Sequence, residues 1–425
     1  MLIEFSVTNY LSIKERATLS MVASNDDALE DSNVFSIAKQ RLVRSAVLYG
    51  ANASGKSNIL SALHLARRMI LTSSKDMQAN EEIGVEPFLL STECDEKPSV
   101  FEVVFINAGT LYRYGFQADR KFIHAEWLFS RPSTKEATLF EREGSDIRVN
   151  AERFKEGRGL EERTRENALF LSVCAQFNGE IATALLTWFQ NLRMLQGFAS
   201  MGMLAATIER LQEPGNKIRI LQLAQVADPG IKDYDFRQKK LTLQDLPKEM
   251  SEQMKRDIMK ESPVIVELKT EHRKVDAAKK DMGAVLFDLD DNESAGTQKL
   301  VNLSGPILDT LEHGRVLVVD ELDARMHPLL TRMIVSLFNS SANRSNAQLV
   351  FASHDTTLLT SKLFRRDQIW FAEKDRYGAT DLYSLAELKG VRKEATFAKD
   401  YIQGKYGAIP FIGDPKWLFC EDGHE

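Results

Sequence analysis

Gly50-Ala51-Asn52-Ala53-Ser54-Gly55-Lys56-Ser57 is the stretch that decides the fold. It follows a short apolar run, Val47-Leu48-Tyr49, and precedes a helical pattern that places Ile59, Leu60 and Leu63 on one face. The pattern G-x-x-x-x-G-K-[ST] between a strand and a helix is typical of a P-loop, whose backbone N–H groups surround phosphate oxygens. A glycine turn that arose by chance is the alternative, and the flanking strand and helix favour the P-loop.

The residue types in this loop indicate how it would hold a nucleotide. Gly50, Ser54 and Gly55 belong to the backbone cradle, and the helix N-terminus adds its positive dipole end. Lys56 is expected to reach the β- and γ-phosphates, and the hydroxyl of Ser57 is expected to ligate Mg²⁺. The sequence therefore predicts ATP and Mg²⁺ as cofactors.

A second apolar run ends in two acids, Asp320 and Glu321. The run Val316-Leu317-Val318-Val319 is typical of a buried parallel strand, so the acids would emerge at the carboxyl edge of the sheet. There Asp320 would hold Mg²⁺ through its water shell, and Glu321 would polarise the attacking water. An ordinary strand that ends in solvated acids is the alternative.

A third short apolar run, Leu349-Val350-Phe351-Ala352, leads to Ser353 and His354. A histidine at this strand end could hydrogen-bond the γ-phosphate or the attacking water. A structural histidine is the more common case. Ser353-His354-Asp355 is not a hydrolase triad, because neighbouring residues on a strand point in different directions.

Ser294 and Gly296 precede another amphipathic helix, which carries Leu300, Leu303 and Ile307 on its apolar face. A hydroxyl and free N–H groups at a helix N-terminus make a second anion cradle. A simple helix cap is the alternative reading. One chain needs a single P-loop per ATP, so the second cradle is most useful if it contacts the γ-phosphate held by another subunit.

These motifs together carry a family resemblance. Residues 50–58, Ser294-Ala295-Gly296, Asp320 to Asp323 and Ser353-His354 resemble those of ABC-type ATPases of the SMC and RecF group. The sequence is more similar still to the bacterial defence ATPases related to the OLD (overcoming lysogenization defect) proteins, including the PARIS and abortive-infection ATPase subunits. The resemblance extends over nearly the whole chain except its helical part.

The resemblance implies a head-to-tail homodimer, or a higher homo-oligomer, that encloses two ATP molecules. Ser294 and Gly296 would act in trans as the signature motif, and His354 would be the switch histidine. Leu322-Asp323 would form the dimer-contact loop. The resemblance also implies that Asn52 and Asn58 contact the nucleotide. It implies that Gln176, which follows an expected buried strand at 168–173, contacts Mg²⁺. A surface glutamine is the alternative for Gln176.

Three features of this sequence differ from those of the related families and narrow the function that we expect. The signature is Glu-Ser-Ala-Gly-Thr rather than the Leu-Ser-Gly-Gly-Gln of transporters, and no heptads of SMC length are sustained. OLD proteins carry a C-terminal Toprim nuclease domain, and we expect no intact nuclease domain here. The resemblance then implies a separately encoded nuclease effector as partner.

The chain pattern predicts an α/β fold with a P-loop, an antiparallel β subdomain and a helical insertion, and the resemblance implies that these form an ABC-type P-loop NTPase head. The expected parts are an N-terminal lobe with P-loop and β-meander (1–178), the helical insertion (179–262), a C-terminal lobe with signature, acids and histidine (263–410), and a tail (411–425). The 425 residues include 43% hydrophobic and 27% charged residues, which is ordinary for a globular protein. Three distant cysteines and no long apolar stretch predict a cytoplasmic protein without a membrane span.

Two functions remain open at this level. The first is an antiviral sensor that switches by ATP-dependent dimer closure and controls the nuclease effector. The alternative is a RecF-like repair ATPase that clamps DNA, against which the net charge of −6 argues without excluding it. The lysine pairs 239–240 and 279–280 are interleaved with acids, so a solvated face competes with a DNA strip. A transporter subunit and a structural ATP clamp are disfavoured by the signature and by the intact acids, respectively.

Overall fold

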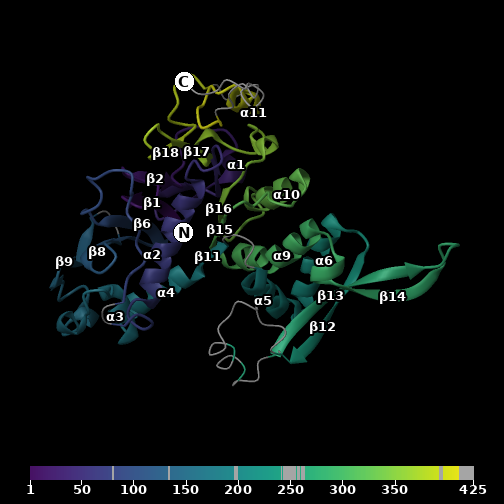
Figure 1. The fold of residues 1–425 in the computed structure, drawn as a ribbon, viewed down its shortest axis with the longest axis horizontal. Coiled ribbons are helices and arrows are strands. Elements are labelled where there is room, and N and C mark those ends of the chain that lie inside the picture. Colours follow the sequence, from purple (N-terminus) through teal and green to yellow (C-terminus); the bar gives the residue numbers. More distant parts are fainter. Residues whose placement is uncertain are drawn as a thin grey trace, which may run out of the picture. The chain divides into compact units, whose positions relative to one another are not determined.

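A computed structural model of the chain describes residues 1–78, 81–132, 135–195, 200–240, 242, 255, 259, 264–391 and 396–410. The chain divides into two compact units (Figure 1). The first unit comprises Met1–Met194, Leu311–Leu322 and Ile334–Glu425, and the second comprises Leu195–Thr310 and Asp323–Met333.

The first unit contains a seven-stranded antiparallel sheet in the order β10-β9-β8-β7-β6-β1-β2. Ala108 and Gly109, both with positive φ, make the two-residue turn between β6 and β7. The antiparallel meander expected from residue 99 onward is therefore confirmed. The strands are β1 (Leu2–Thr8), β2 (Ala17–Ser20), β6 (Ser99–Asn107), β7 (Thr110–Ala118), β8 (Ile123–Arg131), β9 (Ala137–Glu143) and β10 (Asp146–Val149).

The second sheet of this unit has six strands in the order β11-β15-β16-β5-β17-β18. The pairs β15–β16, β16–β5 and β5–β17 are parallel, and β18 returns antiparallel to β17. Every residue of β5, β15 and β16 is buried, which is why these strands read as unbroken apolar runs. The strands are β11 (Leu192–Leu195), β15 (Val316–Val319), β16 (Gln348–Ala352), β5 (Ser45–Tyr49), β17 (Ile369–Lys374) and β18 (Thr380–Ser384); β3 (Val34–Ile37) and β4 (Gln40–Val43) form a separate pair.

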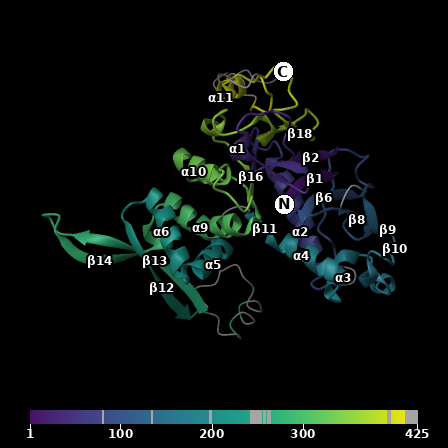
Figure 2. The same ribbon diagram turned by 180° about the vertical axis from the view of Figure 1, so that it is seen from behind.

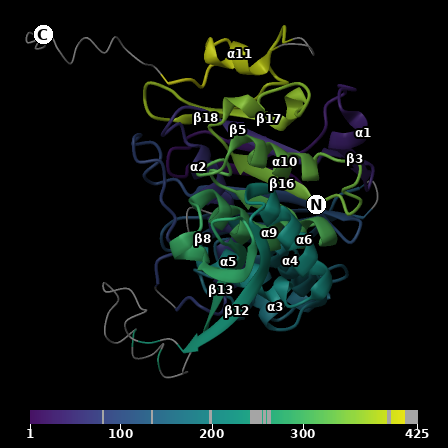
Figure 3. The ribbon, with the colours of Figure 1, turned by 90° about the vertical axis from the view of Figure 1, so that its right-hand side faces the viewer.

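Helix α2 (Lys56–Thr72) joins the two sheets through one hydrophobic core. Ile59, Leu63 and Met69 of this helix belong to the same buried cluster as Phe105 of the antiparallel sheet and Val350 of the parallel one. Helix α11 (Phe397–Ile402) packs on the β17 side (Figure 3). There Tyr401 stacks on Phe371. The other helices of the unit are α1 (Glu30–Asn33), α3 (Phe170–Gln176), α4 (Glu180–Asn191) and residues 334–338 of α10 (Pro328–Phe338), with 3₁₀ turns at Lys155–Gly157, Glu161–Arg163, Thr356–Leu358 and Arg366–Gln368.

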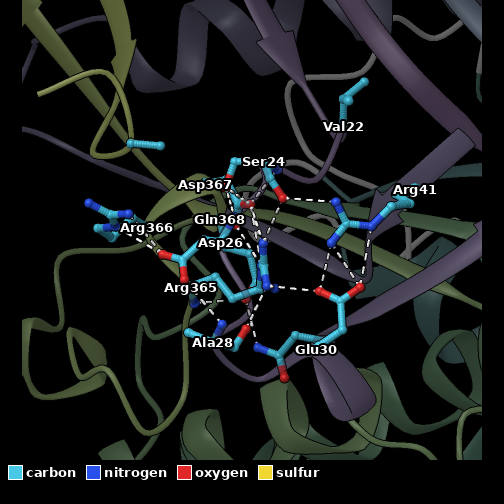
Figure 4. A network of polar contacts seen from close by, with 12 residues as sticks. Val22, Ser24, Asp26, Ala28, Glu30, Arg41, Arg365, Arg366, Asp367 and Gln368 are labelled. Carbon is cyan, nitrogen blue, oxygen red and sulfur yellow. Dashed lines mark hydrogen bonds and ion pairs between the residues drawn. The ribbon is translucent and has the colours of Figure 1, made fainter. Parts of the chain in front are cut away.

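A buried arginine fastens an N-terminal segment to the start of β17 (Figure 4). The side chain of Arg365 has 0% exposure and pairs with Asp367 at 2.8 Å. It also donates to the carbonyl oxygens of Ala28 (2.5 Å) and Ser24 (3.3 Å) and pairs with Glu30 at 3.3 Å. Because every part of the guanidinium has a partner, this buried charge is compensated.

The second unit is built on a three-stranded antiparallel sheet, β12-β13-β14, covered by helices. Its β13–β14 hairpin is long, and Figures 1 and 2 show it as a projecting ribbon from both sides. Helices α5 and α9 lie in close contact, because Thr207 Oγ1 donates to Asn302 O (3.0 Å) and a Cβ on Gly305 would lie 2.5 Å from Thr207 Cα. The elements are α5 (Ser200–Leu211), α6 (Pro214–Ala227), β12 (Ile231–Lys240), β13 (Val264–Val275), β14 (Asp281–Asp288), α8 (Leu289–Asn292) and α9 (Ala295–His313).

The structure corrects two sequence expectations. Residues 168–173, expected as a buried strand, lead into helix α3, because the Glu126 carboxylate accepts the N–H groups of Phe170 (2.6 Å) and Leu171 (3.0 Å) at the helix start. Residues 231–240, expected within a helical insertion, form strand β12. A short apolar run carries no period that separates strand from helix, which explains the first error.

The insertion also begins later than expected, since helix α4 belongs to the first unit. Lys279 and Lys280 are exposed beyond the end of β13. The tail 411–425 and most of residues 241–262 of the expected insertion lie outside the described residues. Over the described part of the chain, no helix combines the length and the apolar character needed to cross a bilayer.

Candidate functional site

Three parallel strands of the first unit end side by side, and each carries one of the sequence motifs. In their register Val319 pairs with Phe351, which pairs with Val47. One step further along, Asp320 is level with Ala352 and Leu48. The following positions bring Glu321, His354 and the start of the P-loop to this same edge. The acids, the histidine and the P-loop, which are far apart in sequence, are therefore neighbours at one sheet edge, as expected for parallel strands.

The two P-loop glycines sit where no side chain fits. A Cβ on Gly50 would overlap the carbonyl oxygen of Ala372, and one on Gly55 would overlap the hydroxyl of Thr380. Gly55 has a φ of 104° and is the N-cap of α2. Because a glycine N-cap offers no side chain to the first-turn N–H groups, these groups suit an external anion.

Lys56 is held inside the loop. Its side chain is buried, and Nζ donates to the carbonyl oxygens of Gly50 (2.9 Å) and Ala51 (3.0 Å). The ammonium is thus placed within the turn that the sequence predicts to be a phosphate cradle. Asn52 and Ser57 are exposed on the same loop, and Ser54 is buried.

A chain of hydrogen bonds, in which each hydroxyl accepts one bond and donates the next, supports the P-loop. Asn58 Nδ2 donates to Ser12 Oγ (2.6 Å), and Thr380 Oγ1 donates to the carbonyl oxygen of Ser54 (2.9 Å). Ser12 and Thr380 are joined at 2.7 Å, and since the Thr380 proton is already used, Ser12 is the donor of that bond. Sequence reasoning missed Ser12 and Thr380, because nothing local marks a residue that supports a loop 46 or 326 positions away.

The two acids differ in their surroundings. Asp320 is half-buried, and its buried Oδ1 has no hydrogen-bond partner among the described residues. Glu321 is exposed and has a φ of 52°, a conformation that non-glycine residues rarely adopt. After it, Leu322 N donates to Ala352 O (3.1 Å), which resumes pairing with β16. The turn therefore directs Glu321 outward at the edge while Asp320 stays inside.

His354 is exposed at the end of β16. The backbone around it is fixed, since Ser353 N donates to Leu48 O (3.1 Å) and Tyr49 Oη donates to Asp355 O (2.9 Å). Tyr49 is the residue before the P-loop, so the two loops are tied to each other.

Ser294 and Gly296 belong to the second unit, at the start of α9. Ser294 Oγ accepts the N–H of Thr297 (3.2 Å), which is the capping role that was one of the two readings. A Cβ on Gly296 would lie 2.9 Å from Arg325 O, so glycine allows the helix start to approach the segment after Asp323. Ser294 remains exposed.

Gln176 is not brought to the P-loop. It is the exposed last residue of α3, whose start is bonded to Ser73 at the C-terminal end of α2. Helix α2 has 17 residues and begins at the P-loop, so its two ends are about 25 Å apart.

The residues present fit a magnesium-bound nucleoside triphosphate. The glycines leave room for phosphate oxygens, Lys56 supplies a cation, and the partnerless Oδ1 of Asp320 calls for a hydrated cation or another donor. Ser57 offers an exposed hydroxyl one residue after the lysine.

The chain is similar to one protein family and, more distantly, to solved structures. A family model described as "AAA domain, putative AbiEii toxin, Type IV TA system" matches residues 45–360, and no curated protein matches. Among solved structures, an SMC head bound to the C-terminal winged-helix domain of ScpA has 12% identity and a TM-score of 0.46, covering 90% of this chain and 97% of that one. The SMC head domain from Thermotoga maritima has 10% identity and a TM-score of 0.40, covering 90% and 98%.

The family match spans both the P-loop and the acids at the end of β15, and it covers more than half of the chain. The chain therefore belongs to the family of AAA domains described as putative AbiEii toxins of type IV toxin–antitoxin systems.

Proposed function

We propose that the protein binds ATP with Mg²⁺ at the edge of β15, β16 and β5 and hydrolyses it there. The observation that supports the proposal most is the strand register, in which Val319, the residue before Asp320, pairs with Phe351, and Phe351 pairs with Val47, three residues before the P-loop. The unpartnered Oδ1 of Asp320 supports the same conclusion, since a buried carboxylate oxygen needs a partner.

Each residue then has a separate task. The first-turn N–H groups of α2 and the Lys56 ammonium bind phosphate oxygens, and Ser57 and Asp320 hold Mg²⁺ and its water shell. Mg²⁺ neutralises charge that develops on the phosphate oxygens. Glu321 accepts a hydrogen bond from the attacking water and orients it, and His354 hydrogen-bonds the γ-phosphate or that water.

The second anion cradle supports a dimeric switch. The proposal places Ser294 and Gly296 of one copy on the γ-phosphate bound by another copy, so that ATP closes a dimer and hydrolysis opens it. What supports this is that Ser294 is exposed at the N-terminus of a 19-residue helix, while the P-loop already has its own helix. His354 is likewise exposed at the edge where the second copy would dock.

The cellular role follows from the family and the resemblance. The family description names a type IV toxin–antitoxin system, and together with the resemblance this supports a defence module in which this ATPase controls a partner such as a nuclease effector. A clamp on DNA, as in RecF, is the second candidate, and the net charge of −6 disfavours it. DNA binding that strengthens with ATP and weakens steeply with salt would decide for the clamp.

Glu321→Gln tests the hydrolytic step. The variant should still bind ATP, should release phosphate about 10²–10⁴-fold more slowly, and should accumulate dimers in light scattering with ATP and Mg²⁺. The matched control is Glu162→Gln, an exposed glutamate in the 3₁₀ turn Glu161–Arg163, which should leave both readouts unchanged. Wild-type turnover in Glu321→Gln would contradict the proposed role of the glutamate.

Mixing two inactive variants tests the trans arrangement. Lys56→Ala and Ser294→Ala would each be inactive alone, and an equimolar mixture would regain activity, because a mixed dimer contains one intact site. A mixture that stays as inactive as its components, although light scattering shows mixed dimers, would refute the assignment of Ser294.

A further inference from the structure

Three potential metal ligands meet in the second unit, away from the P-loop edge. Asp228, His272 and Glu293 each offer one ligand atom, and these atoms all lie within 4.8 Å of one another. They come from the turn after α6, from β13 and from the residue between α8 and Ser294. We propose that they form a binding site for a divalent transition-metal cation of the Zn²⁺ class.

The histidine and the glutamate are already positioned. His272 Nε2 lies 2.7 Å from Glu293 Oε1, and their side chains are 12% and 4% exposed. The imidazole stacks on Phe287 with ring centroids 4.5 Å apart, which fixes its plane. The hydroxyl of Thr270 hydrogen-bonds the same Glu293 oxygen. Such partners that orient ligands are a regular part of metal sites.

Asp228 faces this pair across Gly230. Its Oδ1 accepts the N–H of Gly230 at 2.7 Å. A Cβ on Gly230 would lie 2.8 Å from that oxygen and 3.1 Å from His272 Nδ1. The glycine therefore keeps open a space that the carboxylate and the imidazole both border.

A buried, unpartnered hydroxyl gives an independent sign of a missing ligand. Tyr234 is 4% exposed, and its Oη has no hydrogen-bond partner among the residues that the structure describes. It stands directly across from Thr270 in the β12–β13 pairing, so it shares a sheet face with Thr270 and His272. Burial, and then the nearby charge of Glu293, raise the pKa of Tyr234. Water in the fourth position of a metal would satisfy this hydroxyl.

The ligand set selects the class of cation. One imidazole and two carboxylates with a water is a set that Zn²⁺ accepts in tetrahedral geometry, whereas Mg²⁺ and Ca²⁺ prefer oxygen ligands alone. The cation would join the turn after α6 and strand β13 to the residue before Ser294, and so would fix the start of α9. None of its ligands belongs to the nucleotide site, so the inference stands apart from the proposed function.

Zinc binding can be measured directly. The full-length protein is stripped with a chelator, transferred to nucleotide-free buffer and titrated with ZnCl₂ by calorimetry, and retained metal is counted after gel filtration. We expect one equivalent of zinc per chain and a higher Tm with zinc. His272→Gln should weaken the affinity by more than about 100-fold, and Tyr234→Phe by about 10–100-fold. Asp320→Asn, at the nucleotide site, should still bind zinc.

The matched control is His124→Gln, because His124 is an exposed residue that pairs with Asp119 at 2.6 Å and has no third potential ligand close by among the described residues. It should bind zinc as the wild type does. If His272→Gln fails to fold, Glu293→Gln is used as the test variant instead, because this substitution keeps the size of the side chain. No zinc binding by the wild type at micromolar concentration, or equal loss in His124→Gln and the site variants, would overturn the proposal.

Discussion

Thr380→Val removes one hydroxyl from the support of the P-loop while keeping the shape of the side chain. The variant loses the bond from Thr380 to the carbonyl oxygen of Ser54 and the bond from Ser12. Thr380 is buried, so the Ser54 carbonyl is left without this donor, at a cost of about 1–3 kcal/mol. If this cost falls on the loop conformation that binds phosphate, ATP affinity should drop about 5–150-fold.

Two measurements separate the effect on the loop from a general loss of stability. Urea denaturation gives the change in the free energy of unfolding, and titration with a fluorescent ATP analogue gives Kd. Thr187→Val is the control, since Thr187 is an exposed helical residue that bonds only the Thr183 carbonyl (2.9 Å), and it should change stability by less than about 0.5 kcal/mol. Unaltered stability and Kd in Thr380→Val would refute the supporting role of the hydroxyl chain.

Three further predictions concern single residues. Lys56→Ala should remove measurable ATP binding in the same titration, because the cation placed in the cradle is lost, and wild-type affinity would contradict the P-loop assignment. Gln176→Ala should keep the ATP turnover rate within about twofold of the wild-type rate, since Gln176 lies toward the end of α2 that is far from the P-loop. A tenfold loss of turnover would instead support the contact of Gln176 with Mg²⁺ that the sequence resemblance implied. Arg365→Met should lower the free energy of unfolding by about 3–5 kcal/mol in urea, because Asp367 is left as an uncompensated buried charge, and a loss below about 1 kcal/mol would contradict this.

The parts of the fold that the sequence predicted are those with a local signal. Such a signal is present in the P-loop motif and in the apolar runs of β15 and β16. It is also present in the turn residues between the strands of the β-meander. The carboxyl ends of parallel strands lie at the same edge of a sheet, so the sequence alone was enough to predict that the P-loop and Asp320 lie close together.

The rest depended on partners distant in sequence. Helix α3 was mistaken for a strand because its start is capped by Glu126, a residue more than 40 positions earlier. Ser12 and Thr380 gave no sign of their role, because each is an ordinary polar residue outside any motif. The cluster of Asp228, His272 and Glu293 was missed because its spacing matches no metal motif and only the sheet brings it together.

The hydroxyl chain behind the P-loop also bears on biosynthesis. Ser12 and Thr380 are separated by 368 positions, so a ribosome that adds about 5–20 residues per second needs about 20–75 s to supply the second after the first. During that interval the emerging polypeptide contains the loop but lacks the threonine that holds it. The hydrogen-bonded support of the P-loop is therefore completed only late in translation.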